Sequence, residues 1–135
     1  MTLKRKAVFL DRDGVINKEI IYLHKIKDFE FTENCIDALK TLQSNNFLLF
    51  IVTNQAGIGR GYYTESDFHQ LNNWMLTTLE KQNVKITEVQ FCPHHAEEGI
   101  GEYKIDCECR KPKAGMLTSL IEKYQIDTEN SILIG

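Results

Sequence analysis

Long apolar runs and a strong excess of one charge are both missing from this sequence, and each absence excludes a class of protein. The formal net charge is -3, so the chain has no general attraction to nucleic acid or to an anionic membrane surface. No apolar run approaches the roughly 20 residues of a membrane-spanning helix. The basic start, Met1 to Lys6, precedes only four apolar residues, 7–10, which are too few for a signal peptide. We therefore expect a cytoplasmic protein with no membrane or nucleic-acid partner.

Size and composition are those of an ordinary globular protein. The chain has 135 residues, of which 42% are hydrophobic and 26% are charged. A chain of this length can bury roughly two-thirds of its unfolded surface around one core. We expect a single domain over 1–135 that acts as a monomer on a small molecule.

Two carboxylates follow the most strand-like segment of the chain. The apolar run Ala7–Leu10 leads directly into Asp11, Arg12, Asp13 and Gly14. A short, continuous apolar run is typical of a strand buried on both faces of a parallel sheet. Ligands of such sheets bind beyond the carboxyl ends of the strands, so Asp11 and Asp13 lie where chemistry is expected. The alternative is an Asp-rich turn, since Asp-x-Asp-Gly is also common turn chemistry.

The rest of the chain alternates between helix and strand patterns. A mixed excursion is expected over 18–33, helices over 34–45, from 64 and from 112, and strands over 47–52, 85–91 and 131–135. Strand, helix and strand of these lengths form a βαβ unit with parallel strands, which indicates the α/β class. Thr53, directly after the second strand, should then lie beside Asp11 at one edge of the sheet.

A glycine-rich segment follows the second strand. Its three glycines within 57–61 suggest a flexible loop whose backbone N–H groups could face a ligand, or simply a turn. Thr64 and Asp67 then resemble a capping box at the start of a helix. The apolar side chains of this helix recur at helical spacing and are predicted to face the core: Phe68, Leu71, Met75 and Leu79.

Three cysteines and a histidine occur in two closely spaced pairs, Cys92 with His94 and Cys107 with Cys109. Zinc favours a tetrahedral shell of thiolates and imidazole, and a shell without an open position is structural. We predict a zinc-binding loop over 92–109, with His95 as the alternative histidine ligand. Cys35 falls inside a predicted helix and is expected in the core. Arg110 and Lys111 follow the last thiolate, where a fixed loop would hold them near a phosphate.

These motifs together resemble the haloacid dehalogenase-like phosphotransferase superfamily. The match consists of 9–14 as its first motif, 53–55 as its second and Lys111 as its third. The cysteine and histidine loop narrows the resemblance to the branch of histidinol-phosphate phosphatases and D-glycero-D-manno-heptose 1,7-bisphosphate phosphatases. The segment 57–61 and the long spacer before Cys107 look more like the heptose enzymes. The resemblance implies a Rossmann-like three-layer sandwich whose parallel sheet has strand order 4-1-2-3 for the part present.

By that resemblance, the protein is a magnesium-dependent phosphatase of a sugar bisphosphate, serving heptose synthesis for the lipopolysaccharide core. Asp11 would be the nucleophile that forms an aspartyl-phosphate, and Asp13 would protonate the leaving oxygen and later activate water. Magnesium would be held by Asp11 and the backbone carbonyl of Asp13. Thr53 and Lys111 would position the transferring phosphate and neutralise its charge. The residues expected to hold the substrate are Arg12, Glu19, Tyr22, Asn54, Gln55, Arg60 and Arg110.

One part of the family pattern lies beyond this sequence. The family continues, after the glycine that corresponds to Gly135, with an acidic motif that normally completes the magnesium shell. We therefore expect a C-terminally incomplete fold whose fourth strand forms an open edge. Two alternatives to the heptose enzyme stay open: a histidinol-phosphate phosphatase with the same chemistry, and a zinc-stapled module that binds a sugar phosphate without hydrolysing it.

Overall fold

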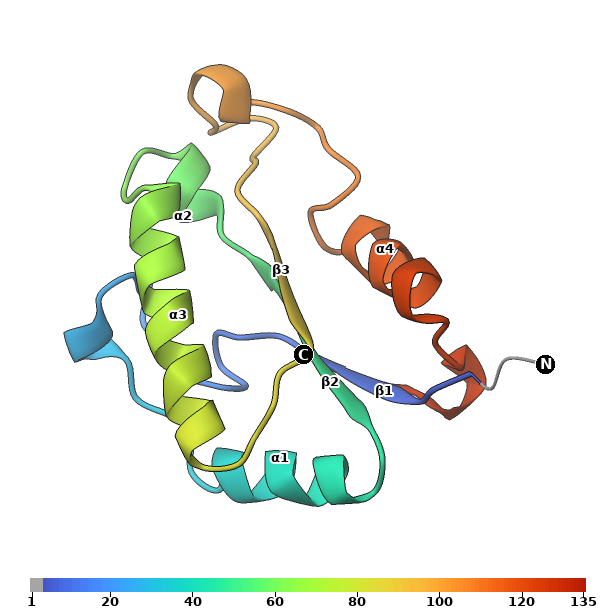
Figure 1. Cartoon of the computed structure of the whole chain (residues 1–135). Coiled ribbons are helices and arrows are strands. Elements are labelled where there is room, and N and C mark those ends of the chain that lie inside the picture. The colour runs from blue at the N-terminus through green and yellow to red at the C-terminus, as the bar shows by residue number, and fades with distance from the viewer. Residues whose placement is uncertain (1–3) are drawn as a thin grey trace.

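The structure is a computed structural model that describes residues 4–135 as an α/β fold around a parallel sheet (Figure 1). Residues 1–3 of the basic start, which entered the signal-peptide argument, lie outside the described residues. The strands are β1 Ala7–Leu10, β2 Leu48–Asn54, β3 Glu88–Cys92 and β4 Ile132–Ile134. Their order in space is β3-β2-β1-β4, which confirms the strand order implied by the resemblance.

Helices connect the strands and cover the sheet. Their bounds are α1 Cys35–Ser44, α2 Ala56–Gly59, α3 Glu65–Lys81 and α4 Gly115–Tyr124. Short 3-10 helices occupy Ile26–Asp28, Gly101–Tyr103 and Thr128–Asn130. The predicted capping box opens α3: Thr64 Oγ1 accepts from the N–H of Asp67 at 3.0 Å, and the Asp67 carboxylate accepts from the N–H of Thr64 at 2.9 Å.

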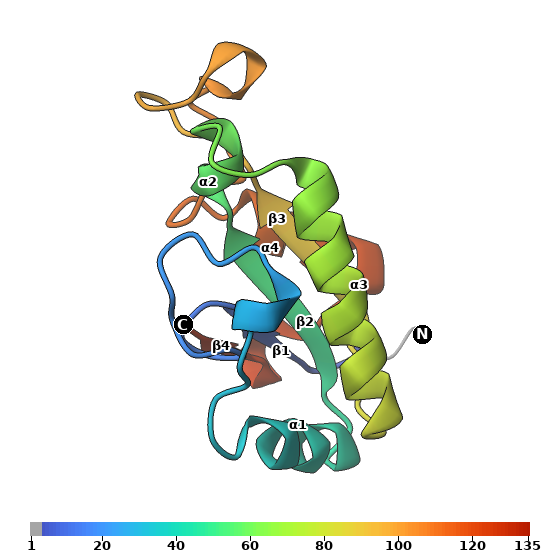
Figure 2. The same ribbon diagram turned by 90° about the vertical axis from the view of Figure 1, so that its left-hand side faces the viewer.

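The central strands are buried on both faces, which gives the fold its three layers. Successive side chains of a strand point to opposite faces of the sheet. Val8 therefore packs in one cluster with Leu39 of α1 and Leu71 of α3. Phe9, the next residue, packs in a second cluster with Met116 of α4. Figures 1 and 2 show the same division, with α1 and α3 on one side of the sheet and α4 on the other.

The glycine-rich segment is not the flexible loop that the sequence suggested. Its first part forms the one-turn helix α2, and Gly57, Ile58 and Gly59 are buried. A Cβ atom at Gly57 would collide with the rings of Tyr22 and Tyr63. Glycine is therefore needed at this position for close packing against two aromatic rings, and the segment forms a buried corner after β2.

Two predicted boundaries also change, because residues next to each element adopt other conformations. The fourth helix begins at Gly115 rather than at Pro112, since a turn first forms in which the N–H of Lys113 donates to the carbonyl of Arg110 at 2.9 Å. The third strand begins at Glu88 rather than at 85. Both changes leave the order of the elements as predicted.

Strand β4 forms an edge of the sheet, as predicted, and its apolar side chains are exposed. Ile132, Leu133 and Ile134 are 43%, 59% and 37% exposed, unlike the fully buried side chains of β1. The strand still pairs with β1 over three residues, so it lies directly beside the segment that leads into Asp11. Across residues 4–135, every helix is too short or too polar to cross a membrane.

Candidate active site and metal centre

Asp11 lies at the carboxyl end of β1, beside the ammonium group of Lys111. The N–H of Asp11 donates to the carbonyl of Ile134 at 3.0 Å and so extends the pairing of β1 with β4. Oδ1 of Asp11 accepts from the N–H of Arg12 at 2.8 Å and lies 3.1 Å from Nζ of Lys111. The side chains of Lys111 and Asp11 are 25% and 29% exposed, so a ligand can reach the pair.

Asn54, at the end of β2, holds the backbone of Lys111 in this place. Its Oδ1 accepts from the N–H of Lys111 at 3.0 Å, and its Nδ2 donates to the carbonyl of Lys111 at 3.2 Å. Nζ of Lys111 also donates to the carbonyl of Val52 at 3.0 Å. Both ends of the Asn54 amide are used within the protein, which supports a positioning role, and its contact with substrate stays a prediction.

Asp13 accepts hydrogen bonds unequally on its two carboxylate oxygens. Oδ1 accepts from Nε and Nη2 of Arg12 at 3.2 and 2.9 Å and from Nδ2 of Asn17 at 3.1 Å. Oδ2 accepts only from Nε2 of Gln55, at 3.2 Å, among the described residues. Asp13 is held in a turn closed by Gly14, whose φ of +86° lies in the region that favours glycine.

Arg12 and Gln55 were predicted to touch the substrate; both are almost fully buried, and their contact with substrate stays a prediction. Their relative exposures are 1% and 2%. The Arg12 guanidinium also donates to the carbonyl of Leu23 at 3.2 Å and lies over the ring of Phe68 at 5.9 Å. The polar atoms of both side chains therefore form hydrogen bonds with Asp13 and with other groups of the protein interior.

Thr53 is brought to the predicted edge of the sheet, but its side chain faces inward. The residue is 0% exposed, and its Oγ1 accepts from Nε2 of Gln55 at 2.9 Å. Direct contact between this hydroxyl and a phosphate stays a prediction.

The remaining predicted substrate residues surround the site more loosely. Glu19 is exposed, and its carboxylate lies near Gly14. Tyr22 is 39% exposed and packs edge-on against the ring of Tyr62 at 4.6 Å. Arg60 is partly buried just after α2, and Arg110 donates to the carbonyl of His94 at 3.3 Å. Their contacts with substrate stay predictions.

Oxygen atoms at the end of β1 fit part of a magnesium shell. Magnesium prefers oxygen ligands and often takes one or two carboxylates, with water and phosphate completing the shell. Asp11 offers a partly exposed carboxylate, and the backbone carbonyl of Asp13 accepts no hydrogen bond from the residues that the structure describes. Three of the four donors to the Asp13 carboxylate lie on Oδ1, and one lies on Oδ2. The Asp11 carboxylate and the Asp13 carbonyl are the groups that the resemblance implies for magnesium.

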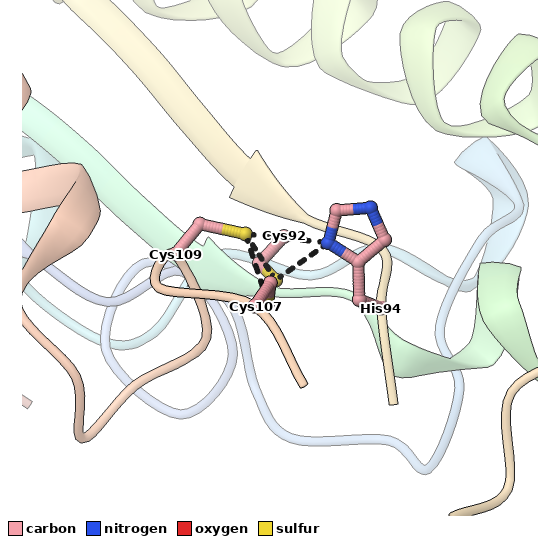
Figure 3. A group of neighbouring side chains, drawn as sticks. All are labelled: Cys92, His94, Cys107 and Cys109. Carbon is pink, nitrogen blue, oxygen red and sulfur yellow. Dashed lines mark hydrogen bonds between the residues drawn. The ribbon is translucent and has the colours of Figure 1, made fainter. Parts of the chain in front are cut away.

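A separate cluster of sulfur and nitrogen ligands lies at the end of β3 (Figure 3). The ligand atoms of Cys92, His94, Cys107 and Cys109 all lie within 4.8 Å of one another. Sγ of Cys92 is 3.3 Å from Sγ of Cys107 and 2.6 Å from Sγ of Cys109, and Nδ1 of His94 is 3.4 Å from Sγ of Cys109. We call these four residues the Cys/His cluster. One cation could contact all four atoms, so the cluster could hold a metal ion.

The neighbouring histidine and the fourth cysteine take no part in the cluster. Nδ1 of His95 accepts from the N–H groups of Glu97 and Glu98 at 3.2 and 2.9 Å, so this ring faces its own loop. The structure therefore favours His94 over the alternative ligand. Cys35 is buried in the core as predicted, and burial raises the pKa of its thiol.

The thiols of the Cys/His cluster differ in acidity. Burial raises the pKa of Cys92, and the hydrogen bond with Cys109 raises it further. Burial also acts to raise the pKa of Cys107, but hydrogen bonds from Cys109 and Cys92 outweigh it and lower the pKa to about 6. Metal ligands must be deprotonated, so a cation binding here would release the protons that the other thiols retain.

Two residues of the site were missed by the sequence analysis. Asn17 is fully buried and donates to Asp13, four residues before it in the sequence. Tyr63 is 6% exposed, and its hydroxyl donates to Oε1 of Gln55. Asn17 belongs to the same sequence segment as Asp13 and could have been considered. Tyr63 carries no local signal, since only the fold brings it to Gln55.

Known proteins resemble the chain over nearly its whole length. The family model described as polynucleotide kinase 3 phosphatase matches residues 7–135. A D-glycero-beta-D-manno-heptose-1,7-bisphosphate 7-phosphatase of Haemophilus influenzae is 49% identical over 130 residues, which are 96% of this chain and 70% of that protein. A D-glycero-alpha-D-manno-heptose-1,7-bisphosphate 7-phosphatase of Photorhabdus laumondii is 48% identical over 132 residues, which are 98% of this chain and 72% of that protein.

A solved structure shares the fold as well. The structure, described as a had-like phosphatase of Mesorhizobium loti, has a TM-score of 0.91 and 32% sequence identity to this chain. The match covers 98% of this chain and 63% of that one, so this chain spans less than two-thirds of the solved structure. The α/β architecture is therefore common to both over the part present here.

Proposed function

The chain belongs to the haloacid dehalogenase-like phosphatases, and from this membership we propose that it removes the C7 phosphate of D-glycero-D-manno-heptose 1,7-bisphosphate. The two curated relatives are named as 7-phosphatases of this sugar bisphosphate, which supports the choice of substrate. The single observation that carries the proposal is the 3.1 Å contact between Asp11 and Lys111 at the end of β1. It brings a nucleophile and a phosphate-binding cation together at the ligand-binding edge of the sheet.

The reaction takes place in two steps, with Asp11 as a covalent carrier. In the first step, a carboxylate oxygen of Asp11 attacks phosphorus, and the bond from phosphorus to the sugar oxygen breaks. Asp13 gives its proton to that leaving oxygen, which becomes the C7 hydroxyl. In the second step, Asp13 takes a proton from water as the water oxygen attacks phosphorus. Inorganic phosphate leaves, and both carboxyl groups return to their starting states.

Phosphoryl transfer depends mainly on positioning and on offsetting negative charge. An anionic phosphate and the Asp11 carboxylate repel each other, and the Lys111 ammonium beside Asp11 reduces this repulsion. Asn54 keeps that ammonium in place through the Lys111 backbone. Magnesium, held by the Asp11 carboxylate and the Asp13 carbonyl, would supply further positive charge to the phosphate oxygens.

The Cys/His cluster is proposed to bind zinc as a structural ion. Three thiolates and one imidazole are a donor set that zinc favours, and four protein ligands leave no open position for substrate. Cys109 precedes Lys111 by two residues. A closed zinc shell would therefore fix the segment that delivers Lys111 to Asp11.

The test is phosphate release from both anomers of the heptose bisphosphate and from histidinol phosphate, with magnesium and with a chelator. We expect magnesium-dependent release that is fastest from a heptose bisphosphate. Asp11→Asn should lower turnover by a factor on the order of 10⁶, because the covalent nucleophile is lost. Asp37→Asn is the matched control: this exposed residue lies in the first turn of α1, and the variant should keep its activity.

Each contrary outcome identifies a different error. Faster release of phosphate from histidinol phosphate would show that the protein is a histidinol-phosphate phosphatase instead. Tight binding of sugar phosphate without release would make the protein a binding module. Full activity in Asp11→Asn would show that Asp11 is not the nucleophile.

A further inference from the structure

The two carboxylate oxygens of Asp13 differ in the number of hydrogen bonds that they accept. Oδ1 accepts from three N–H groups, of Arg12 and Asn17, at 2.9 to 3.2 Å. A carboxylate oxygen has about two lone-pair sites, so Oδ1 has no capacity left for another partner. Oδ2 accepts from Gln55 alone among the described residues. A proton on Asp13 would therefore reside on Oδ2.

The arrangement of Oδ2 depends on which way the Gln55 amide points. Nε2 of Gln55 donates both to Oδ2 of Asp13 at 3.2 Å and to Oγ1 of Thr53 at 2.9 Å. If the amide turned over, its oxygen would face Oδ2, where it would repel the ionised carboxylate and hold the proton of the neutral acid in a hydrogen bond to Gln55 instead of to the substrate. The amide must be held against this rotation for Asp13 to work.

Tyr63 supplies that restraint from the other end of the amide. Its hydroxyl donates to Oε1 of Gln55, and its ring is stacked on His24 with centroids 4.9 Å apart and planes 3° apart. Burial raises the pKa of Tyr63 to about 12, so the hydroxyl keeps its proton at physiological pH and remains a donor. A hydroxyl that donates to Oε1 leaves only Nε2 for Asp13.

Arg12 holds the other oxygen of Asp13, Oδ1, through two hydrogen bonds. Its buried guanidinium is anchored by the carbonyl of Leu23 and by the ring of Phe68, besides its two bonds to Asp13. Arg12 and Gln55 are both almost fully buried, and both donate hydrogen bonds to Asp13. An effect of either side chain on the reaction would therefore pass through Asp13.

We propose that Arg12 and the Gln55–Tyr63 pair are positioning residues that leave Oδ2 as the single oxygen of Asp13 able to exchange a proton with the substrate. The inference rests on the proposed phosphatase function and adds three residues to it. None of the three is a catalytic residue, because each acts through Asp13. Tyr63 is the one of the three that contacts Asp13 only through Gln55.

The test compares two substrates in Tyr63→Phe, which removes only the hydroxyl. Release of the sugar oxygen needs a proton from Asp13, whereas 4-nitrophenolate is a good leaving group and needs none. The value of kcat/KM reports the steps up to formation of the aspartyl-phosphate. We expect Tyr63→Phe to lower kcat/KM for heptose bisphosphate by about 10-fold, a part of the 10²- to 10⁴-fold that a general acid contributes. For 4-nitrophenyl phosphate, kcat/KM should change by less than about 2-fold.

Two further variants make the result decisive in the full-length protein. Gln55→Met keeps the size of the side chain and removes its N–H groups, so it should show the same selectivity to a greater degree. Tyr124→Phe is the matched control, because its hydroxyl donates to Glu88 at 2.7 Å on the α4 side of the sheet. It should leave both substrates unaffected.

Equal losses on the two substrates in Tyr63→Phe would overturn the inference and leave the phosphatase function standing, since such a result reflects structure alone. No loss on either substrate would overturn it too. An unaltered protein that releases phosphate from neither substrate would overturn the proposed function, and the inference with it.

Discussion

The Cys/His cluster and the carboxylate site at the end of β1 are assembled in opposite ways. The cluster takes all four side chains from the single segment 92–109, and its ligand atoms contact one another. The carboxylate site joins residues that are distant in sequence. Gln55 reaches Asp13 across 42 residues, and Asn54 reaches Lys111 across 57. A local cluster can be completed by one metal ion, whereas the dispersed site exists only when the sheet has formed.

The two regions meet at the segment that follows the cluster. Lys111 belongs to the cluster segment by sequence and to the carboxylate site by its contacts with Asn54 and Asp11. Its backbone is therefore held from two directions: by the cluster at Cys109 and by the amide of Asn54. A metal ion in the cluster could therefore influence the carboxylate site without touching it, through the position of Lys111.

Removal of the zinc proposed for the Cys/His cluster should have the largest effect, and it should be confined to one region. Structural zinc contributes apparent free energies of about 10–16 kcal/mol in small zinc peptides, which sets an upper scale for the loss here. We expect a chelator to speed amide hydrogen exchange over 93–106 and to weaken the binding of inorganic phosphate. Exchange in β1 and β2 should change less, because their packing against α1 and α3 does not involve the cluster segment, although their other face packs against Cys92, Cys107 and Cys109.

Two cysteine variants give this prediction its control. Cys109→Ser should lose bound zinc and reproduce the effect of the chelator. Cys35→Ala alters a core cysteine outside the cluster and should retain its zinc. Unchanged phosphate affinity in protein stripped of metal would show that Lys111 does not depend on the cluster.

Replacement of Asp13 should have the next largest effect, and it acts on the dispersed site alone. Asp13→Asn keeps the shape of the side chain but cannot carry the proton to the leaving oxygen. We expect kcat/KM for heptose bisphosphate to fall by about 10²- to 10⁴-fold, the usual contribution of a general acid. Zinc content should be unchanged. A loss smaller than about 10-fold would contradict the assignment of Asp13 as the proton donor.

Local sequence patterns were sufficient for most of the fold and for the cluster. An unbroken apolar run at Ala7–Leu10 predicts a buried strand, and Thr64 with Asp67 predicts the start of α3. The cluster could be predicted because its ligands occur in pairs separated by one residue, at the two ends of a single loop. In each case the signal and the structure it specifies lie within a few residues.

Local patterns were insufficient where a residue's surroundings come from distant parts of the chain. Arg12 lies between two aspartates, and the sequence does not reveal that its guanidinium contacts the carbonyl of Leu23 and the ring of Phe68. The glycines after β2 resemble a flexible loop, but the rings that require Gly57 belong to other segments. No pattern near either residue records those neighbours, so only the folded structure shows their roles.

The smallest of the expected effects comes from Asn54, which joins the two regions. Asn54→Ala removes the two hydrogen bonds to the Lys111 backbone. Each is worth about 1 kcal/mol net, so their loss together should lower phosphate affinity by at most about 30-fold. The matched control is Asn45→Ala, because the Asn45 amide donates to the carbonyl of Thr41 at 2.7 Å where α1 ends, away from the site.

The same variant also measures how strongly the two restraints on Lys111 are coupled. If the cluster and Asn54 hold the same cation, removal of the metal should weaken phosphate binding more in Asn54→Ala than in the unaltered protein. A double-mutant cycle of Asn54→Ala with Cys109→Ser gives this difference directly from phosphate dissociation constants. Strictly additive losses would mean that the cluster and Asn54 act on Lys111 independently, and the proposed link between the two regions would fail.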